Sequence, residues 1–468
     1  MKNKTIATLM LIALLLCGVL IKTYYISYTE TWERQHDVIG FGADEGHAAY
    51  IEYILDNKKL PDFDPREKWG FFQPPLHHIV SAVAMDVSEY LGADEHRAQE
   101  NTQVVTCIEM ILVMLMSVWM FLNAKGITKF IYSHRNGEIV TEGIVVMLSI
   151  VGLHPIFTLM SGSINNDALA LTLSMVSLVL AVKWYDDPDY IVTLLMAISI
   201  GCAMLAKLTG GLVAVPIGIL MVLKLFGFDG GLRDDGHAKV TFFDHIKFFF
   251  KKYLLKSALF AVVVVPLGLS FGIKNKIKWD MPLNYIPPVG ENFPDSITLK
   301  NRLFDIETSS VYTFLTTRGD SFDEYNIPLA MVKTSLFGEY NYSDVSRWMR
   351  VLAPTVFVTG IILILIALIA TAYMMLSKKS RLSLKWKIIL FGTWATYLMA
   401  YLYFAFTNRN FSAQDFRYAA ICIVCEGIFT GLFVDTVNNK KIKYSVMAIG
   451  LVFALASLGT YLLLGFKS

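Results

Sequence analysis

The sequence predicts an all-α protein that crosses a membrane many times. Of its 468 residues, 55% are hydrophobic and only 17% are charged, and the mean hydropathy is +0.51. This composition is too apolar for a soluble protein of this length. The apolar residues gather in stretches of roughly 18 to 25, each long enough to cross a hydrocarbon core about 30 Å thick as a helix. The formal net charge of +2 gives no indication of nucleic acid as a partner.

Averaging hydropathy over about 19 residues gives roughly eleven membrane-spanning helices. The first follows a basic N-terminus and lacks a small-residue cleavage site after it, so we expect an uncleaved helix rather than a signal peptide. No linker, repeat or low-complexity tract divides the chain, which predicts a single membrane domain over residues 1–468. The predicted spans lie near residues 5–22, 103–124, 138–160, 166–184, 189–206, 209–227, 253–273, 350–376, 386–407, 417–435 and 443–465.

The basic residues predict how the spans are oriented. They gather in every second connection, and by the positive-inside rule those connections and the N-terminus face the cytoplasm. The first loop, residues 23–102, and the long loop, residues 273–347, then lie outside the cytoplasm. The long loop, with aromatic stretches such as Tyr340-Asn341-Tyr342, is expected to be a lid or an acceptor surface. The basic set comprises Lys2, Lys4, Lys125, Lys129, Arg135, Arg233, Lys239, Lys247, Lys251, Lys252, Lys378, Lys379, Arg381, Lys385, Lys387, Lys440, Lys441 and Lys443.

Two amphipathic helices are expected in the first outer loop. The first begins at Asp44 and ends before Leu60-Pro61, and the second begins at Pro74-Pro75. Amphipathic helices beside a membrane lie in the interface plane, where this pair would form a platform over the bundle. The apolar positions are Ala48, Ile51, Ile54 and Leu55 in the first helix, and Leu76, Ile79, Val80, Val83, Val87 and Leu91 in the second.

An acidic cluster, Asp44-Glu45 with His47, opens the first of these helices. One interpretation is a helix cap in which the acids compensate the helix dipole. The other is a reactive site, because paired carboxylates at a membrane surface cost solvation free energy unless a positive or reacting group lies beside them. A carboxylate of this kind can act as a general base.

Three further polar positions share the predicted outer side. Asp167 follows Asn166 at the start of a span and is either a helix cap or part of a site. Lys207 interrupts apolar sequence, and it either snorkels to water or binds a phosphate. Arg417, followed by Tyr418, has the same two interpretations, and its guanidinium can bind an anion with two hydrogen bonds.

Two acids, Glu109 and Glu426, fall inside predicted spans. Such carboxylates face a substrate groove or a transport path, or are satisfied by hydrogen bonds between helices. His77 and His78 lack the spacing of a zinc site. The sequence has no Walker loop, no GxGxxG after a strand and no GxSxG elbow. The energy for a synthetic reaction outside the cytoplasm would then arrive in an activated lipid.

The order of these motifs resembles that of the polytopic lipid-dependent glycosyltransferases of the GT-C superfamily, within it the protein O-mannosyltransferase and aminoarabinose-transferase branch. The motifs that carry the resemblance are Asp44-Glu45, Leu60-Pro61, Gln73-Pro74-Pro75-Leu76, His154-Pro155 to Asn166-Asp167, Ala206-Lys207-Leu208-Thr209-Gly210, Ser335-Leu336-Phe337-Gly338 and Arg417-Tyr418. The chain departs from the branch at Ala419-Ala420, where a proline-containing continuation is typical, and it lacks the soluble C-terminal domain of several relatives.

The resemblance implies a GT-C-like fold and an inverting transferase without a nucleotide cofactor. It would move a sugar from a polyprenyl-phosphate carrier to a glycan, lipid or protein outside the cytoplasm. By the resemblance Asp44 is the catalytic base and Glu45 its companion, and Lys207 and Arg417 are candidates for the carrier phosphate. Asp167 and His47 are expected near an acceptor or a divalent cation, Mg²⁺ or Mn²⁺, and the substrate groove is expected at Gln73, Asn166, Tyr418, Glu109 and Glu426.

The alternative function is a membrane transporter or flippase of a lipid-linked or small polar substrate. Glu109, Glu426 and Lys207 would be its coupling groups, and the chain would show internal repeats and helices broken near the midplane. No internal repeat is evident in the sequence. A non-enzymatic assembly subunit is a third interpretation, which explains the acidic cluster only as helix capping.

Overall fold

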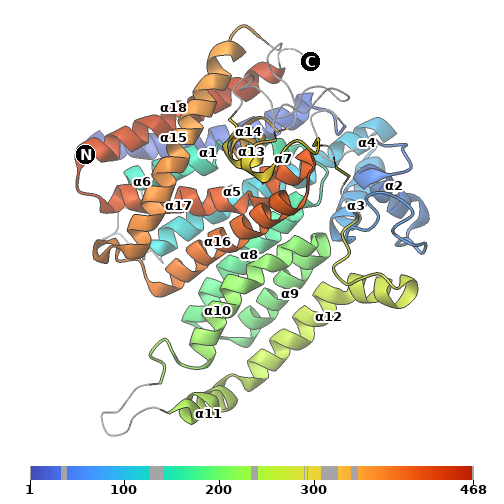
Figure 1. The fold of residues 1–468 in the computed structure, drawn as a ribbon, viewed down its shortest axis with the longest axis horizontal. Helices are drawn as coiled ribbons and strands as arrows, with labels where there is room; N and C mark the ends of the chain where they lie inside the picture. The colour runs from blue at the N-terminus through green and yellow to red at the C-terminus, as the bar shows by residue number, and fades with distance from the viewer. Residues whose placement is uncertain are drawn as a thin grey trace.

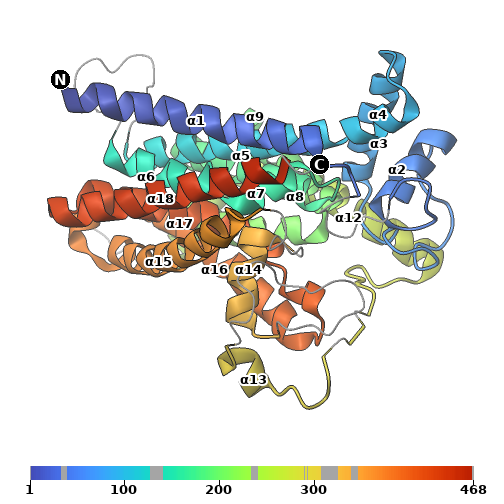
Figure 2. The same ribbon diagram turned by 90° about the horizontal axis from the view of Figure 1, so that it is seen from above.

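Long helices run side by side through the molecule, and a group of short helices gathers at one end (Figures 1 and 2). The computed structural model describes residues 2–32, 40–126, 141–232, 241–288, 290–291, 293–306, 325–338 and 346–465. These residues form helices and no strands, as the sequence predicts. The basic positions Lys129, Arg135, Arg233 and Lys239 lie outside the described residues.

Eight described helices are long and apolar enough to cross a membrane, and two bent helix pairs raise this number to ten. The eight are α1 (Lys2–Tyr28), α5 (Gln103–Ala124) with the preceding α4 (Glu95–Asn101), α8 (Asp167–Asp186), α10 (Ala214–Leu225) with η1 (Leu208–Val213), α12 (Leu254–Trp279), α15 (Met349–Leu376), α16 (Leu384–Thr407) and α18 (Lys440–Gly465). The apolar α9 (Tyr190–Ala206) has 17 residues. All eleven predicted spans therefore coincide with helical segments, whereas the number that cross the membrane stays a prediction.

Two predicted spans are broken helices rather than continuous ones. The first consists of α6 (Glu142–Val151) and α7 (Pro155–Ser161), which bend by 49°. Proline lacks an N–H and disfavours helical backbone at the residue before it, so the helix stops before Pro155. The carbonyl of Gly152 at the break accepts a 2.9 Å hydrogen bond from the buried Lys22 ammonium. The second consists of η3 (Phe411–Gln414) and η4 (Phe416–Ala419) with α17 (Ile421–Thr436), bent by 47°.

Glycines let α6 and α17 approach each other closely. A Cβ on Gly143 would lie 2.3 Å from the Gly431 carbonyl oxygen, and a Cβ on Gly431 would lie 2.5 Å from the Gly143 carbonyl oxygen. Helices in membranes associate through such small residues, because lipid offers no hydrophobic driving force between them. At the same end of the contact, Asp435 accepts hydrogen bonds from the Gly143 N–H at 3.0 Å and from Lys125 at 2.5 Å.

The first loop contains α2 (Gly46–Asn57) and α3 (Leu76–Tyr90), close to the predicted bounds. The buried face of α3 is largely polar and includes His77, His78 and Ser81, whereas Val83 and Val87 of the predicted apolar stripe are exposed. The stripe thus points mainly away from the protein. This is the arrangement that an interfacial helix needs, and the position of α2 and α3 in the interface plane stays a prediction.

One amphipathic helix, α11 (Phe242–Lys252), is not predicted from the sequence. Phe242, Phe243 and Phe250 are exposed on it, as are Lys251 and Lys252 of its last turn. From the sequence, this segment is predicted only as a basic connection between spans. Its lysines and phenylalanines are mixed within a short run, so hydropathy does not indicate a helix there. Residues Thr241 and Asp244 begin the helix with a capping box.

The segment between α12 and α15 has helices of its own. Helix α12 continues to Trp279, six residues beyond the predicted end at 273. It is followed by α13 (Leu299–Phe304) and α14 (Ile327–Phe337), whereas the short helix η2 (Lys378–Ser380) comes after α15. Helix α14 is buried against the bundle. The aromatic stretch Tyr340-Asn341-Tyr342 lies outside the described residues.

Candidate functional site

Three interruptions of the helices meet in a buried cluster of charged side chains. Lys207 Nζ lies 2.6 Å from Asp167 Oδ1, and Arg417 Nε lies 3.3 Å from Asp167 Oδ2. A second acid, Asp415, has its Oδ2 3.8 Å from Arg417 Nε. The structure therefore brings together three of the residues that the sequence singled out, although Lys207 and Arg417 follow Asp167 by 40 and 250 residues in the chain. We call Asp167, Lys207, Asp415 and Arg417 the charged cluster.

The local backbone explains the position of Asp167 and Lys207. Asp167 begins α8, and its N–H donates a 2.7 Å hydrogen bond to Asn165 Oδ1. Lys207 ends α9 in extended conformation, and η1 starts directly after it. The chain returns so tightly that a Cβ on Gly210 would lie 2.4 Å from the Ala203 carbonyl oxygen. Only glycine fits there, which gives the Lys-Leu-Thr-Gly sequence a structural reason.

Arg417 is held by its own short helix. Asp415 caps η4 and accepts the Arg417 N–H at 2.9 Å. The Tyr418 hydroxyl accepts from an Arg417 Nη at 3.1 Å, and its ring lies 4.7 Å from Lys207 Nζ, within cation–π distance. Asp415 is not among the site residues predicted from the sequence, although the spacing Asp-Phe-Arg is typical of an acid that caps a helical turn by accepting the N–H two residues on.

The charged cluster is buried, and the charges of its four described residues balance. The side chains of Lys207 and Asp167 are 13% and 8% exposed, and that of Arg417 is 3% exposed. Lys207 therefore does not snorkel to water. Two cations face two acids, and buried charges of this kind need partners to offset the cost of desolvation. An incoming anion can be bound when the cations exchange partners, with hydrogen bonds made stronger by the low local dielectric.

Gln73 and Asn166 connect the charged cluster with the first loop. The Asn166 amide donates to Gln73 Oε1 at 3.2 Å and to the Ala206 carbonyl at 2.9 Å. Asn166 is adjacent to Asp167, and Ala206 is adjacent to Lys207. Gln73 thus belongs to the surroundings of the cluster, and its place in a substrate groove stays a prediction.

His47 lies in a different buried group, together with two histidines of α3. His47 Nδ1 and His78 Nε2 share a 2.8 Å hydrogen bond, and the His77 Nε2–H donates to the Ile164 carbonyl at 2.5 Å. Burial lowers the pKa of His77 to about 4. Burial also lowers the pKa of His78 well below its ordinary value, with the nearby charges of His47 and His77 acting in the same direction. These rings fasten α2 and α3 to the turn before Asp167.

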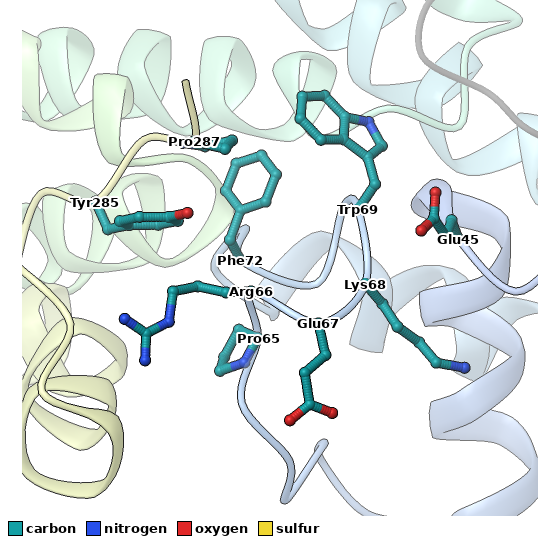
Figure 3. A pocket seen from close by; sticks show the side chains of 9 residues that line it. All are labelled: Glu45, Pro65, Arg66, Glu67, Lys68, Trp69, Phe72, Tyr285 and Pro287. Atoms are coloured by element: carbon teal, nitrogen blue, oxygen red, sulfur yellow. The ribbon is translucent and has the colours of Figure 1, made fainter. Parts of the chain in front are cut away.

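Asp44 and Glu45 lie on the surface rather than in the charged cluster. The Asp44 side chain is 98% exposed, and its nearest cation is Lys68, with 3.7 Å between Nζ and Oδ1. Glu45 occupies the N-cap position of α2 without a side-chain capping hydrogen bond. It lines a pocket of about 380 Å³ together with Lys68 and aromatic residues of the first loop (Figure 3). The capping interpretation therefore fails for the Glu45 side chain.

The two intramembrane acids have different surroundings. Glu426 Oε1 accepts a 2.8 Å hydrogen bond from the Trp394 indole, which joins α17 to α16. Glu109 is buried in α5, and its backbone carbonyl accepts a hydrogen bond from Thr172 of α8 at 3.2 Å. A hydrogen bond between helices thus satisfies the Glu426 carboxylate, whereas Glu109 Oε2 is buried without a hydrogen-bond partner among the described residues. A place in a substrate groove stays a prediction for both acids.

The described residues include no group of three His, Cys, Asp or Glu side chains arranged to hold a metal ion. In the charged cluster, Asp167 already faces Lys207 and Arg417, which supply the positive charge that a cation would bring. A resident Mg²⁺ or Mn²⁺, which one or two carboxylates can hold together with waters and phosphate oxygens, would have to compete with these two cations for Asp167, and such an ion stays a prediction.

The fold is similar to that of solved structures, although no protein-family model and no curated protein matches the sequence. Crystal structures of ArnT from Cupriavidus metallidurans cover 97% of this chain. The apo structure has a TM-score of 0.53 at 11% identity over 76% of its chain. The structure bound to undecaprenyl phosphate has a TM-score of 0.52 at 13% identity over 77% of its chain.

ArnT is an aminoarabinose transferase of the GT-C superfamily. At this sequence identity the likeness shows the fold alone, which is the ArnT-like GT-C fold that the order of the motifs predicted. Together with the apolar helices, it makes the chain a multi-pass membrane protein.

Proposed function

We propose that the protein is an inverting glycosyltransferase that takes its sugar from a polyprenyl-phosphate donor and passes it to an acceptor outside the cytoplasm. The acceptor belongs to the cell-envelope glycans, lipids or proteins. The observation that carries the proposal is the buried pair Lys207 and Arg417, placed at helix breaks in a fold that ArnT shares. Discontinuous helices at membrane depth are where membrane proteins build sites for ionic substrates.

In this proposal the charged cluster receives the phosphate of the donor. The phosphate oxygens take hydrogen bonds from Lys207 and Arg417, which shift from Asp167 toward the ligand. Negative charge grows on the phosphate as its bond to the sugar breaks, so cations already in place lower the barrier. Tyr418, which contacts both cations, holds their positions.

Asp44 is the proposed general base, with Glu45 as its companion. The acceptor hydroxyl gives its proton to the Asp44 carboxylate while its oxygen attacks the anomeric carbon. The bond from that carbon to the phosphate oxygen breaks, and polyprenyl phosphate leaves with the electron pair. Attack opposite the leaving group inverts the anomeric configuration, and general-base help is typically worth about 10²- to 10⁴-fold in rate.

No step of this mechanism passes through a metal ion. The Mg²⁺ or Mn²⁺ suggested by the resemblance would have to displace Lys207 or Arg417 from Asp167. Treatment with EDTA, followed by readdition of either ion, tests this point. A loss of transfer that the ion restores would assign Asp167 to a metal site instead.

The experiment for the proposed function measures release of polyprenyl phosphate from a panel of polyprenyl-phosphate sugars by protein reconstituted in lipid. Wild type is compared with Asp44→Asn, with candidate acceptors present. Asp86→Asn is the matched control, because Asp86 is another exposed acid of the first loop paired to a lysine, Lys58, at 2.8 Å. We expect release by wild type and the control, and a loss of at least about 10²-fold in Asp44→Asn.

Near-normal transfer by folded Asp44→Asn protein would remove Asp44 from the role of base. Movement of the intact donor across the bilayer, without cleavage in any combination, would favour the flippase.

A further inference from the structure

The pocket beside Glu45 has a wall of aromatic rings contributed by two distant segments. Trp69 and Phe72 of the first loop have ring centroids 5.3 Å apart, and Tyr285, which follows α12, lies 6.3 Å from Phe72. Trp69 is 41% exposed. Figure 3 shows the three rings along the pocket with the Glu45 carboxylate at its other end. Its volume of about 380 Å³ is within the range of small-molecule sites.

Hydrogen bonds hold these two segments in place. Arg66 donates to the Trp279 carbonyl at 2.9 Å, and Lys274 donates to the Pro61 carbonyl at 3.0 Å. On the other side, the Gly46 N–H donates to the Trp69 carbonyl at 2.8 Å. The pocket is therefore bounded by α2, the first loop and the outer end of α12, and its walls do not depend on a ligand to meet.

The charges around the pocket disfavour an anion. Arg66 is committed to Asp64 through its guanidinium, with contacts of 2.5 to 3.0 Å, and Lys68 is the cation nearest to Asp44. Glu45 and Glu67 also line the pocket. Two carboxylates and two cations thus line the pocket, and each cation already faces an acid outside the lining, Asp64 or Asp44. A phosphate group would have to compete with these acids for both cations. The charged cluster, with its two buried cations, has the chemistry that the pocket lacks.

Aromatic faces next to carboxylates suit a neutral sugar ring. The face of an aromatic ring carries partial negative charge and attracts the polarised C–H groups of a pyranose. Carboxylates accept hydrogen bonds from hydroxyl groups, and Glu45 and Glu67 are available at the pocket for this. The same pocket contains Glu45, which is adjacent in sequence to the proposed base Asp44.

We propose that this pocket binds a neutral sugar ring of the acceptor, so that the acceptor substrate is a glycan. The inference rests on the proposed function and specifies it, because it places the acceptor at the first loop and the donor phosphate at the charged cluster. Trp69 and Tyr285 supply the stacking surface, and Glu45 and Glu67 bind hydroxyl groups.

Direct binding tests this proposal without measuring transfer. Saturation-transfer NMR on the full chain in lipid nanodiscs would use methyl pyranosides of glucose, galactose, mannose and N-acetylglucosamine as probes. The tripeptide Ac-Ala-Ser-Ala-NH2 represents a protein acceptor, and α-D-glucose 1-phosphate represents an anion. We expect at least one methyl glycoside to bind, with affinity about two- to tenfold weaker in Trp69→Ala and unchanged at higher salt.

Trp348→Ala is the matched control, because Trp348 is also an exposed tryptophan, 57% exposed, and does not line the pocket. It should bind the glycoside like wild type. Glu67→Gln, which keeps the shape of the side chain, should lower the affinity because an amide accepts fewer hydrogen bonds.

Absence of glycoside binding, or equal binding by Trp69→Ala and wild type, would overturn the proposal. Trp69-dependent binding of the tripeptide alone would replace the glycan by a polypeptide, and stronger binding of the sugar phosphate would contradict the charge argument. The proposed function can fail separately. Glycoside binding without release of polyprenyl phosphate from any donor would support the sugar pocket and contradict the transferase proposal. Release of polyprenyl phosphate without glycoside binding would support the transferase and contradict the sugar pocket.

Discussion

Lys207 and Lys125 form two buried ion pairs of nearly the same geometry. Lys207 lies 2.6 Å from Asp167, with side chains 13% and 8% exposed, and Lys125 lies 2.5 Å from Asp435, with side chains 18% and 13% exposed. Helix α17 runs from the neighbourhood of the first pair to the second, so the pairs are at opposite ends of the bundle. Only the first has a second cation, Arg417, beside it among the described residues.

This likeness provides a test of the phosphate role. We expect Lys207→Met combined with Asp167→Asn to weaken binding of undecaprenyl phosphate about 10- to 100-fold, because a charge-assisted hydrogen bond is lost. The double substitution avoids leaving a buried acid without its partner. Titration of the protein in nanodiscs, followed by native mass spectrometry, gives the affinity. The control, Lys125→Met with Asp435→Asn, should bind like wild type, and equal affinity in both doubles would remove Lys207 from the donor site.

Buried His77 makes the stability of the fold depend on pH. Its pKa is about 4 in the folded protein and about 6.5 in the unfolded chain. The unfolded state therefore binds more protons below pH 6.5, so stability is complete above that value and is lost as pH falls toward about 4. Each unit of difference corresponds to about 1.4 kcal/mol, and His78 acts in the same direction.

We therefore expect the melting temperature to fall between about pH 7.5 and about pH 5. His77→Gln keeps a donor for the Ile164 carbonyl and does not titrate, so its melting temperature should fall less over the same interval. An equal fall in the two proteins would place the pH dependence elsewhere.

The sequence could predict some of these residues and not others. Asp167, Lys207 and Arg417 stand out because each interrupts or begins an apolar segment, where a charge is costly. Asp415 escapes notice because it precedes a helical turn that hydropathy does not resolve. Lys68 and Trp69 also escape notice, because no local sequence pattern indicates that the first loop packs against the segment after α12. The roles of all these residues stay predictions.

At the scale of the elements, the contact between α6 and α17 depends on its glycines. We expect Gly431→Ala to destabilise the protein by about 1–3 kcal/mol, because the added methyl overpacks the contact. Its Cβ would lie 2.5 Å from the Gly143 carbonyl oxygen and 2.7 Å from the Phe121 ring. The melting temperature in detergent measures the effect. Gly218→Ala in α10 is the control, since nothing lies within 4 Å of its added Cβ, and an equal effect of the two would contradict the packing argument.

Hydropathy locates the helices but not their breaks. The runs that form α6 with α7, and η4 with α17, look continuous because a hydropathy window averages over a bend. The His154-Pro155 dipeptide is a signal for the first break, whereas the turn at Arg417 has no proline. Helix α11 is not predicted, because its phenylalanines and lysines are too mixed for hydropathy to indicate a span.

At the scale of the whole molecule, the predicted orientation can be tested with single cysteines. Glu95 and Lys379 are both exposed, and the basic connections place the first outside and the second in the cytoplasm. In intact cells, a membrane-impermeant maleimide should label Glu95→Cys, and it should label Lys379→Cys only after permeabilisation. The opposite pattern would invert the bundle and move the proposed active site to the cytoplasmic side.

The overall fold is accessible from the sequence because hydropathy and the order of the motifs report on the whole chain at once. The GT-C-like arrangement of helices is the one predicted. From the sequence, residues of the charged cluster can be predicted only one by one, because the meeting of the helix ends around Asp167 depends on packing. The pocket beside Glu45 depends on contacts between residues about 200 positions apart, which one sequence does not reveal.

Helix α12 connects the pocket beside Glu45 to the other end of the bundle. Its 26 residues span about 39 Å, and it carries the first loop at one end through Trp279 and Lys274. A membrane helix tilts to match its hydrophobic stretch to the hydrocarbon layer. The thickness of the surrounding bilayer is therefore expected to affect the tilt of α12 and, with it, the position of the first loop that α12 carries. Lipid chain length is then expected to affect acceptor binding at the pocket beside Glu45.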